Sequence, residues 1–171
     1  VYGAVSLPKI SSRRQETLLF LGRLDSDTGF TDFMELKKNV PGRLKVEVIG
    51  DGSLSHLIPK DNVKHGFVSD VGPYLIRAKY VFCTGYQGIL EAFSHRKLVL
   101  ATYANPVKKD YLTMHPMSHN IIIENTTSSL IVKLRGINSE VQGKMVDENY
   151  TWATQQTWNK LLSNYKTLWK L

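Results

Sequence analysis

Six short runs of mainly apolar residues recur along the chain, with stretches of helical spacing between them. The runs lack the strict alternation of a strand with one solvated face, so they predict strands that are covered on both faces. Strands that alternate with helices are typical of a parallel sheet built from β-α units. The predicted strands are Thr17–Leu24, Leu44–Ile49, Val63–Phe67, Tyr80–Cys83, Leu98–Thr102 and Asn120–Ile123.

The stretches between these runs carry apolar residues at the spacing of one helix face. Right-handed crossover connections through such helices give a doubly wound sheet, with helices on both of its faces. We therefore predict an α/β fold: a Rossmann-like, doubly wound, mostly parallel six-stranded sheet with a C-terminal amphipathic helix. The predicted helices before that last one are Thr31–Asn39, Leu54–Ile58, Val71–Arg77, Gln87–His95 and Ser128–Leu134.

The two ends of the chain have their own patterns. Residues 1–16 include Leu7-Pro8 and Arg13-Arg14 and predict an arm or linker that leads into a domain over residues 17–171. Near the other end an apolar stripe with spacings of three and four predicts the amphipathic helix. We expect this stripe to cover the side of the sheet or a neighbouring domain. It consists of Trp158, Leu161, Leu162, Tyr165, Leu168 and Trp169.

Composition and charge limit the classes of function. The chain has 171 residues, 42% hydrophobic and 22% charged, which fits one folded domain, and no run is long enough to span a membrane. A net charge of +7 favours anionic partners, but the basic residues are scattered, so we expect a solvated basic surface and no nucleic-acid partner. Cys83 is the only cysteine, which excludes an intramolecular disulfide and favours a reducing, cytoplasmic location.

Glycines stand at the ends of four of the predicted strands, where ligands bind in an open parallel sheet. Each glycine alone is equally explained as a turn former, but four at corresponding places favour a binding site. The fourth turn, Gly85-Tyr-Gln-Gly88, leads directly into a helix. We expect free amides of Gly88 and Ile89 there to face a phosphate.

Two charged residues near these turns have two interpretations each. Arg23 follows a buried strand, where it either binds an anion or pairs with Asp25 or Asp27. Glu91, in the first turn of its helix, either accepts hydrogen bonds from a ribose diol or only interacts with the helix dipole. His115 and His119 have the spacing of metal ligands in a helix, but Pro116 favours a loop, and we predict no metal site.

Several motifs in order resemble one family, the GT-B glycosyltransferases. The resemblance covers about residues 17–134 and is closest to the C-terminal, donor-binding domain of the retaining group 1, or family 4-like, enzymes. No single motif is specific, but their order and spacing are. The motifs are Leu19-Phe-Leu-Gly-Arg-Leu24, Val46-Glu-Val-Ile-Gly-Asp-Gly52, Val63-Lys-His-Gly-Phe-Val68, Ala78-Lys-Tyr-Val-Phe82, Gly88-Ile-Leu-Glu-Ala92 and Lys97-Leu-Val-Leu-Ala101.

The resemblance implies a substrate site for a nucleoside-diphosphate sugar of the UDP or GDP type, with no other cofactor. Arg23 would neutralise the diphosphate, the backbone near Phe67 would receive the base, and Glu91 would bind the ribose hydroxyls. Amides of Gly88 and Ile89 would hold phosphate. The implied site also includes Gly22, Tyr86 and Gln87.

This sequence differs from the family pattern at two positions. Thr28 stands where a lysine usually precedes the glycine of the first loop, so a second cation for the diphosphate is missing or supplied elsewhere. Cys83 stands where a second glutamate usually contacts the sugar. The resemblance also implies that Tyr150-Thr-Trp152 opens a final helix.

The resemblance further implies that this chain is a fragment of a longer enzyme. An N-terminal acceptor domain would be absent, and the chain alone would not catalyse transfer. The acceptor would be linked to a lipid or polysaccharide, with the full protein in the cytoplasm or peripheral at the membrane. Three alternatives stay open at this stage: a catalytically degenerate GT-B-like binding module, a domain like that of a nucleotide-sugar epimerase, and a nucleic-acid binder that rests on the net charge of +7 alone.

Overall fold

The computed structural model describes residues 3–8, 17–40 and 44–170. Its six strands form one sheet in the order β3-β2-β1-β4-β5-β6, and every pair of neighbours is parallel. This confirms the predicted Rossmann-like α/β fold. The strands are β1 (Thr17–Leu21), β2 (Lys45–Ile49), β3 (Val63–Gly66), β4 (Ala78–Phe82), β5 (Leu98–Thr102) and β6 (Ile122–Glu124).

The chain changes its winding direction next to β1. From β1 it runs through β2 to β3 on one side, and then returns to β4 on the other side of β1. The connections after β1 and β4 therefore leave in opposite directions and open a crevice above the carboxyl ends of these strands. In open α/β sheets this point is where ligands bind.

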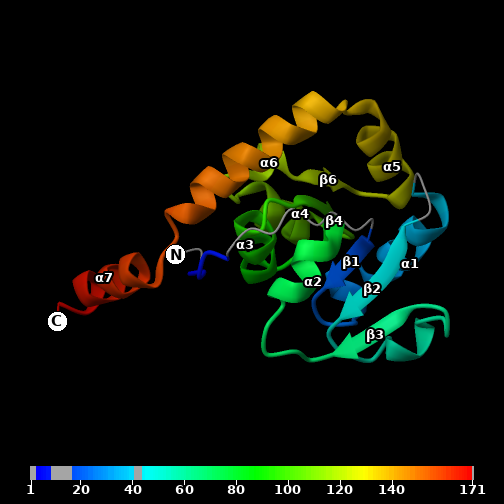
Figure 1. The fold of residues 1–171 in the computed structure, drawn as a ribbon, viewed down its shortest axis with the longest axis horizontal. Coiled ribbons are helices and arrows are strands. Elements are labelled where there is room, and N and C mark those ends of the chain that lie inside the picture. The colour runs from blue at the N-terminus through cyan, green and yellow to red at the C-terminus, as the bar shows by residue number, and fades with distance from the viewer. Residues whose placement is uncertain (1–2, 9–16, 41–43, 171) are drawn as a thin grey trace.

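Helices cover both faces of the sheet (Figure 1). Buried residues of α1 and α5 share one core with Phe20 and Phe82 of the sheet, whereas α2, α3 and α4 contribute to the core on the opposite face. The helix α6 contributes to both cores. The helices are α1 (Phe30–Asn39), α2 (Gly72–Arg77), α3 (Tyr86–Ser94), α4 (Pro106–Thr113), α5 (Thr127–Gly136), α6 (Ser139–Thr154) and α7 (Trp158–Trp169).

Three elements have other boundaries, or another structure, than the sequence predicts. β1 ends at Leu21 because Gly22, at φ 153°, starts a turn. Where a helix was predicted over Leu54–Ile58, the chain forms only a 3-10 turn at Ser55–Leu57. β4 starts two residues earlier than predicted, at Ala78, because α2 runs into it without a loop.

Two helices were not predicted as such. α4 is mostly exposed, and α6 has three buried residues over its sixteen, so neither has a clear apolar stripe. The segment Tyr150–Trp152 lies near the end of α6 and does not open a helix of its own, so that expectation is wrong.

The predicted C-terminal helix is present as α7, but it does not cover the sheet. Figure 1 shows α7 projecting from the rest of the molecule. None of its residues is buried, and Trp158 and Trp169 are 61% and 66% exposed. The expectation that its apolar stripe covers this sheet is therefore wrong, and contact with a neighbouring domain stays a prediction.

The described part of the predicted arm lies against the domain. The amide of Val5 donates to the carbonyl oxygen of Gln156 at 3.0 Å, and the side chain of Gln87 donates to the carbonyl oxygen of Ala4 at 3.2 Å. Ala4 is buried. Ala4 and Val5 thus contact α3 and the segment after α6, while residues 1–2 and 9–16 of the arm lie outside the described residues.

His115 makes the stability of this fold dependent on pH. Its ring is buried against Tyr86, Phe93 and Trp152, and its Nδ1 accepts a hydrogen bond from the amide of Met117 at 3.1 Å. Burial lowers the pKa of His115 to about 4. Between that value and about 6.5, the ordinary pKa of histidine, the unfolded chain binds more protons than the native chain, so acidification favours unfolding.

We expect His115 to account for about 1.5 kcal/mol of the unfolding free energy that is lost between pH 6.5 and pH 5. Urea unfolding at these two pH values measures the loss. His115→Phe should reduce the loss, whatever its effect on stability at pH 6.5. The control His119→Phe removes an exposed imidazole and should leave the loss unchanged. Equal losses in all three proteins would contradict this origin.

Candidate functional site

A cavity of about 340 Å³ lies in the crevice between the carboxyl ends of β1 and β4. Five elements contribute to it: the end of β1, the loop after it, the turn after β4, α3 and α4. The cavity lies at the strand ends where the glycine turns predict ligand binding. The lining residues are Leu21, Gly22, Arg23, Asp27, Thr28, Thr84, Gly85, Gly88, Glu91, Lys108 and Tyr111.

Close backbone contacts hold the loop after β1 at the cavity. The amide of Gly22 donates to the carbonyl oxygen of Ile49 at 3.1 Å, and the amide of Gly50 donates to that of Gly66 at 2.8 Å. A Cβ atom on Gly50 would lie 1.9 Å from the carbonyl oxygen of Gly22. The glycines at these strand exits therefore let three loops meet, which a larger residue at position 50 would prevent.

Arg23 makes both of the ion pairs that the sequence suggested as alternatives to anion binding. Its two terminal nitrogens donate to Asp25 at 3.0 Å and to Asp27 at 2.7 Å. The side chain is 61% exposed, so the pairs contribute little to stability. In this state the guanidinium is shared between two carboxylates.

The first turn of α3 forms one wall of the cavity. Gly85 is its N-cap, and the amide of Ile89 donates to the carbonyl oxygen of Gly85 at 3.0 Å. The expectation of a free Ile89 amide is therefore wrong, and Ile89 itself is buried. The helix ladder offers no partner to the amides of Gln87 and Gly88 in this first turn, and Gly88 lines the cavity.

Glu91 lies one turn further along α3 and also lines the cavity. Burial raises the pKa of Glu91, although a hydrogen bond from Gln87 at 3.1 Å favours its ionised form. Gln87 bridges Glu91 to Ala4 of the arm. The carboxylate is thus held in place and partly removed from water, which suits an acceptor of hydrogen bonds from ligand hydroxyl groups.

Tyr111, which lines the cavity, stacks on Tyr86, which does not line it. The rings of Tyr86 and Tyr111 lie 4.2 Å apart at an angle of 21°. The hydroxyl of Tyr111 accepts from the amide of Tyr86 at 3.1 Å, and the hydroxyl of Tyr86 donates to the carbonyl oxygen of Tyr111 at 2.5 Å. This pairing fixes α4 against the start of α3 and uses the first amide of that helix.

Phe67 is placed apart from the other predicted site residues. It follows β3, is 81% exposed and does not line the cavity. Gly66 before it has a φ of +66°, which turns the chain at the end of β3. The structure thus brings Gly22, Arg23, Gly88 and Glu91 together at the cavity. The other predicted site residues do not line it: Phe67, Tyr86, Gln87 and Ile89.

Helix α4 also contributes to the cavity, above all through Lys108, which was not among the predicted site residues. Its ammonium group donates to the carbonyl oxygen of Thr84 at 3.1 Å, directly after β4. Asn105 caps α4 by accepting from the amide of Lys108 at 2.8 Å. An asparagine followed by Pro106 is a helix-start signal, so the sequence did carry a way to find this element.

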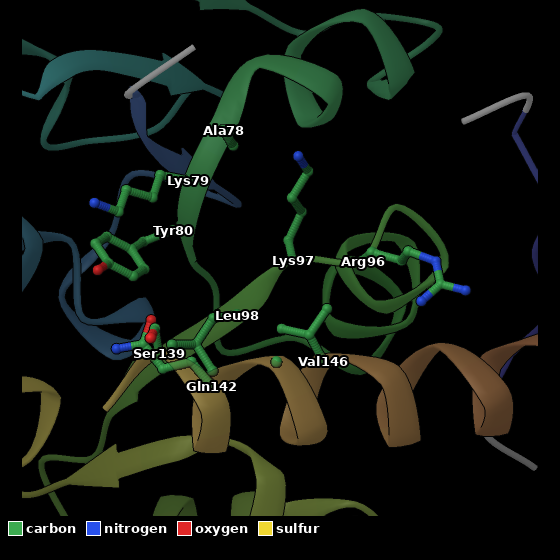
Figure 2. A pocket seen from close by; sticks show the side chains of 10 residues that line it. Ala78, Lys79, Tyr80, Arg96, Lys97, Leu98, Ser139, Gln142 and Val146 are labelled. Atoms are coloured by element: carbon green, nitrogen blue, oxygen red, sulfur yellow. The ribbon is translucent and has the colours of Figure 1, made fainter. Parts of the chain in front are cut away.

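A second cavity, of about 490 Å³, lies at the opposite edge of the sheet (Figure 2). It is bounded by the amino-terminal ends of β4 and β5 and by α6. Arg96 lines it, but its side chain is directed away, pairs with Asp147 and lies over the ring of Tyr150. The first turn of α3 and the glycine loops lie at the other edge, so we do not assign the candidate site here.

Within the described ranges, no cluster of three or more histidine, cysteine, aspartate or glutamate side chains is arranged to hold a metal ion. His115 is buried, whereas His119 is exposed beside Glu148. The thiol of Cys83 is buried below the cavity, and burial raises its pKa, so it is a weak nucleophile. In the same ranges no helix is both long and apolar enough to cross a bilayer.

Comparison with known proteins finds similarity in structure only. No family model and no curated protein sequence matches the chain. A variant of S. aureus TarM in complex with fondaparinux, alpha-GlcNAc-glycerol and UDP superposes with a TM-score of 0.72 at 15% identity, over 96% of this chain and 38% of that one. Anabaena HepE in complex with UDP-glucose has a TM-score of 0.69 at 15% identity, over 92% of this chain and 49% of that one.

A third similar structure is WaaG, a glycosyltransferase involved in lipopolysaccharide biosynthesis. It has a TM-score of 0.61 at 18% identity, over 86% of this chain and 44% of that one. The chain therefore spans less than half the length of each of these three proteins. At such identities the likeness establishes a shared fold.

Proposed function

We propose that this chain is the nucleotide-sugar-binding domain of a GT-B glycosyltransferase of the retaining group 1 type. The observation that carries the proposal is the cavity at the winding reversal of the sheet, which combines the first turn of α3 with Glu91 and cationic side chains. Structures of similar fold were determined with UDP or UDP-glucose, which supports this substrate class.

Each side of the cavity has a role in the proposed complex. The amides of Gln87 and Gly88 hold a phosphate at the positive end of α3. Glu91 accepts hydrogen bonds from the ribose hydroxyl groups, and the base lies toward Phe67. Gly22 and Arg23 approach the diphosphate from the loop after β1, and Tyr86 supports the wall of the cavity through its stack on Tyr111. Ile89 supports the helix from the core and donates no hydrogen bond to the ligand.

The chemistry expected of the full protein is transfer of a hexose-type sugar to an acceptor hydroxyl. As the bond to the sugar breaks, negative charge grows on the departing diphosphate. Preorganised amides and cations stabilise that charge more in the transition state than in the ground state. A second domain on the N-terminal side would hold the acceptor, which we expect to be linked to a lipid or polysaccharide.

Binding of nucleotides to the isolated chain tests the proposal. We expect UDP or GDP to bind, and Glu91→Ala to weaken binding about tenfold to a hundredfold, because one hydrogen bond to a carboxylate is worth about 1.5–3 kcal/mol. Isothermal titration calorimetry measures the dissociation constants. Glu35→Ala, which removes an exposed glutamate of α1, is the matched control and should bind like the wild type.

A nucleotide without ribose hydroxyl groups separates the role of Glu91 from a general effect on the cavity. The wild type should bind 2′,3′-dideoxy-UDP more weakly than UDP, whereas Glu91→Ala should bind the two alike. Absence of binding at millimolar UDP and GDP would overturn the proposed function. An unchanged affinity in Glu91→Ala would instead overturn the assignment of this residue.

A further inference from the structure

The loop after β1 does not supply a net positive charge. Arg23 lies between Asp25 and Asp27, at 3.0 and 2.7 Å, so two carboxylates face one guanidinium. Asp25 is also fixed by hydrogen bonds from the amide and hydroxyl of Ser53, which lower its pKa. Asp25 therefore stays ionised beside Arg23, and a diphosphate that approaches this loop meets a surplus of negative charge.

Thr28 in the same loop does not offset this negative charge, because its side chain is neutral. Its hydroxyl group bonds within the same loop, to the carbonyl oxygens of Arg23 and Asp25 at 2.7 Å each. These bonds shape the loop and leave the surplus unchanged. A side-chain cation without carboxylate partners is therefore to be sought on another element of the cavity.

Lys108 is a cationic side chain that lines the cavity from α4, outside this loop. Its ammonium group donates to the neutral carbonyl oxygen of Thr84 and lies 4.8 Å from the ring centroid of Tyr111. Among the residues that the structure describes, no carboxylate lies within 4.0 Å of it. An ammonium has three donors, so two remain for a ligand after the bond to Thr84.

The position of Lys108 is set by helix α4. Its own amide is bonded to the N-cap Asn105, and the Tyr86–Tyr111 stack holds α4 against α3. The half-buried side chain reaches the exit of β4, beside the first turn of α3. Burial lowers the pKa of Lys108, and a partly desolvated ammonium interacts more strongly with an anion than one in water.

We propose that Lys108, rather than Arg23, is the main side-chain cation for the diphosphate of the bound nucleotide. This inference rests on the proposed function, since it assigns a residue in the same cavity. It deepens that function by making the second phosphate the group that this site recognises. The site then binds a nucleoside diphosphate more tightly than a monophosphate, and this preference comes from Lys108 on α4.

The test compares Lys108→Met with Lys109→Met, its neighbour on the same helix. Methionine keeps an unbranched side chain and removes the charge. Isothermal titration calorimetry with UDP, UMP and uridine, and in parallel with GDP, GMP and guanosine, gives the affinities. We expect Lys108→Met to lose tenfold or more in affinity for the diphosphate and less than twofold for the nucleoside. Lys109→Met should change neither by more than twofold, because its side chain is exposed.

Two further variants complete the design. Lys108→Arg should retain most of the diphosphate affinity, because the charge is kept. Arg23→Met should lose less diphosphate affinity than Lys108→Met. Thermal unfolding of each variant checks that the fold is intact, and Lys108→Gln replaces Lys108→Met if the latter does not fold.

The outcomes separate the two claims. If the wild type binds none of these nucleotides, the proposed function fails and this inference fails with it. If the wild type binds the diphosphate and Lys108→Met binds it equally well, the proposed function stands and the role of Lys108 is refuted. A larger loss in Arg23→Met than in Lys108→Met also refutes it, because the loop after β1 would then supply the charge.

Discussion

Replacement of Gly50 by alanine is expected to lower the unfolding free energy by about 3 kcal/mol or more, enough to leave a marginally stable domain partly unfolded. Gly50 has a φ of +129°, a conformation that side chains disfavour, and the added Cβ would lie 1.9 Å from the carbonyl oxygen of Gly22. Backbone atoms cannot rotate away as a side chain can. The exits of β1 and β2 would therefore have to separate.

Chemical denaturation with circular dichroism measures the loss, and Gly143→Ala is the matched control. Gly143 lies inside α6, and a Cβ atom there would meet nothing within 4 Å. Because alanine favours a helix over glycine by about 0.5–1 kcal/mol, this variant should be slightly more stable than the wild type. A Gly50→Ala protein as stable as the wild type would show that the three loops do not need this close contact.

The sheet could be predicted from the sequence because its strands are buried on both faces. β5 is the clearest case: all residues of Leu98–Thr102 are buried, and the strand was predicted with these bounds. Helices with thin apolar faces gave no such signal. α4 buries only Leu112, and α6 buries Met145, Asn149 and Ala153, so periodicity could not separate them from loops.

The place of the candidate site was predictable, but the partners of its side chains were not. Glycines at strand exits and the parallel topology located the cavity at the carboxyl ends of β1 and β4. From the sequence, Arg23 could pair with Asp25 or with Asp27, and in the structure it pairs with both. Lys108 was missed because it comes from the helix after β5, and only the folded chain brings it beside Thr84.

Replacement of Phe20 by alanine is the second substitution with a large expected effect. Phe20 lies on β1 within a cluster of four phenylalanines, and it is 1% exposed. Its ring centroid lies 5.0 Å from Phe30, 5.1 Å from Phe33 and 5.9 Å from Phe82. Removal of the ring leaves a cavity that fixed neighbours cannot fill, so we expect a loss of about 3–5 kcal/mol of unfolding free energy.

Because Phe20 lies on β1 just before the loop at the candidate site, this loss also bears on function. The cluster joins β1, α1 and β4, the elements that flank the crevice. Phe20→Leu should cost about 1 kcal/mol, since it keeps most of the volume. Phe67→Ala, which removes an 81% exposed ring, should change stability by less than about 0.5 kcal/mol. Urea denaturation gives all three values, and a Phe20→Ala loss no larger than that of Phe67→Ala would mean that this core is not what holds the crevice in shape.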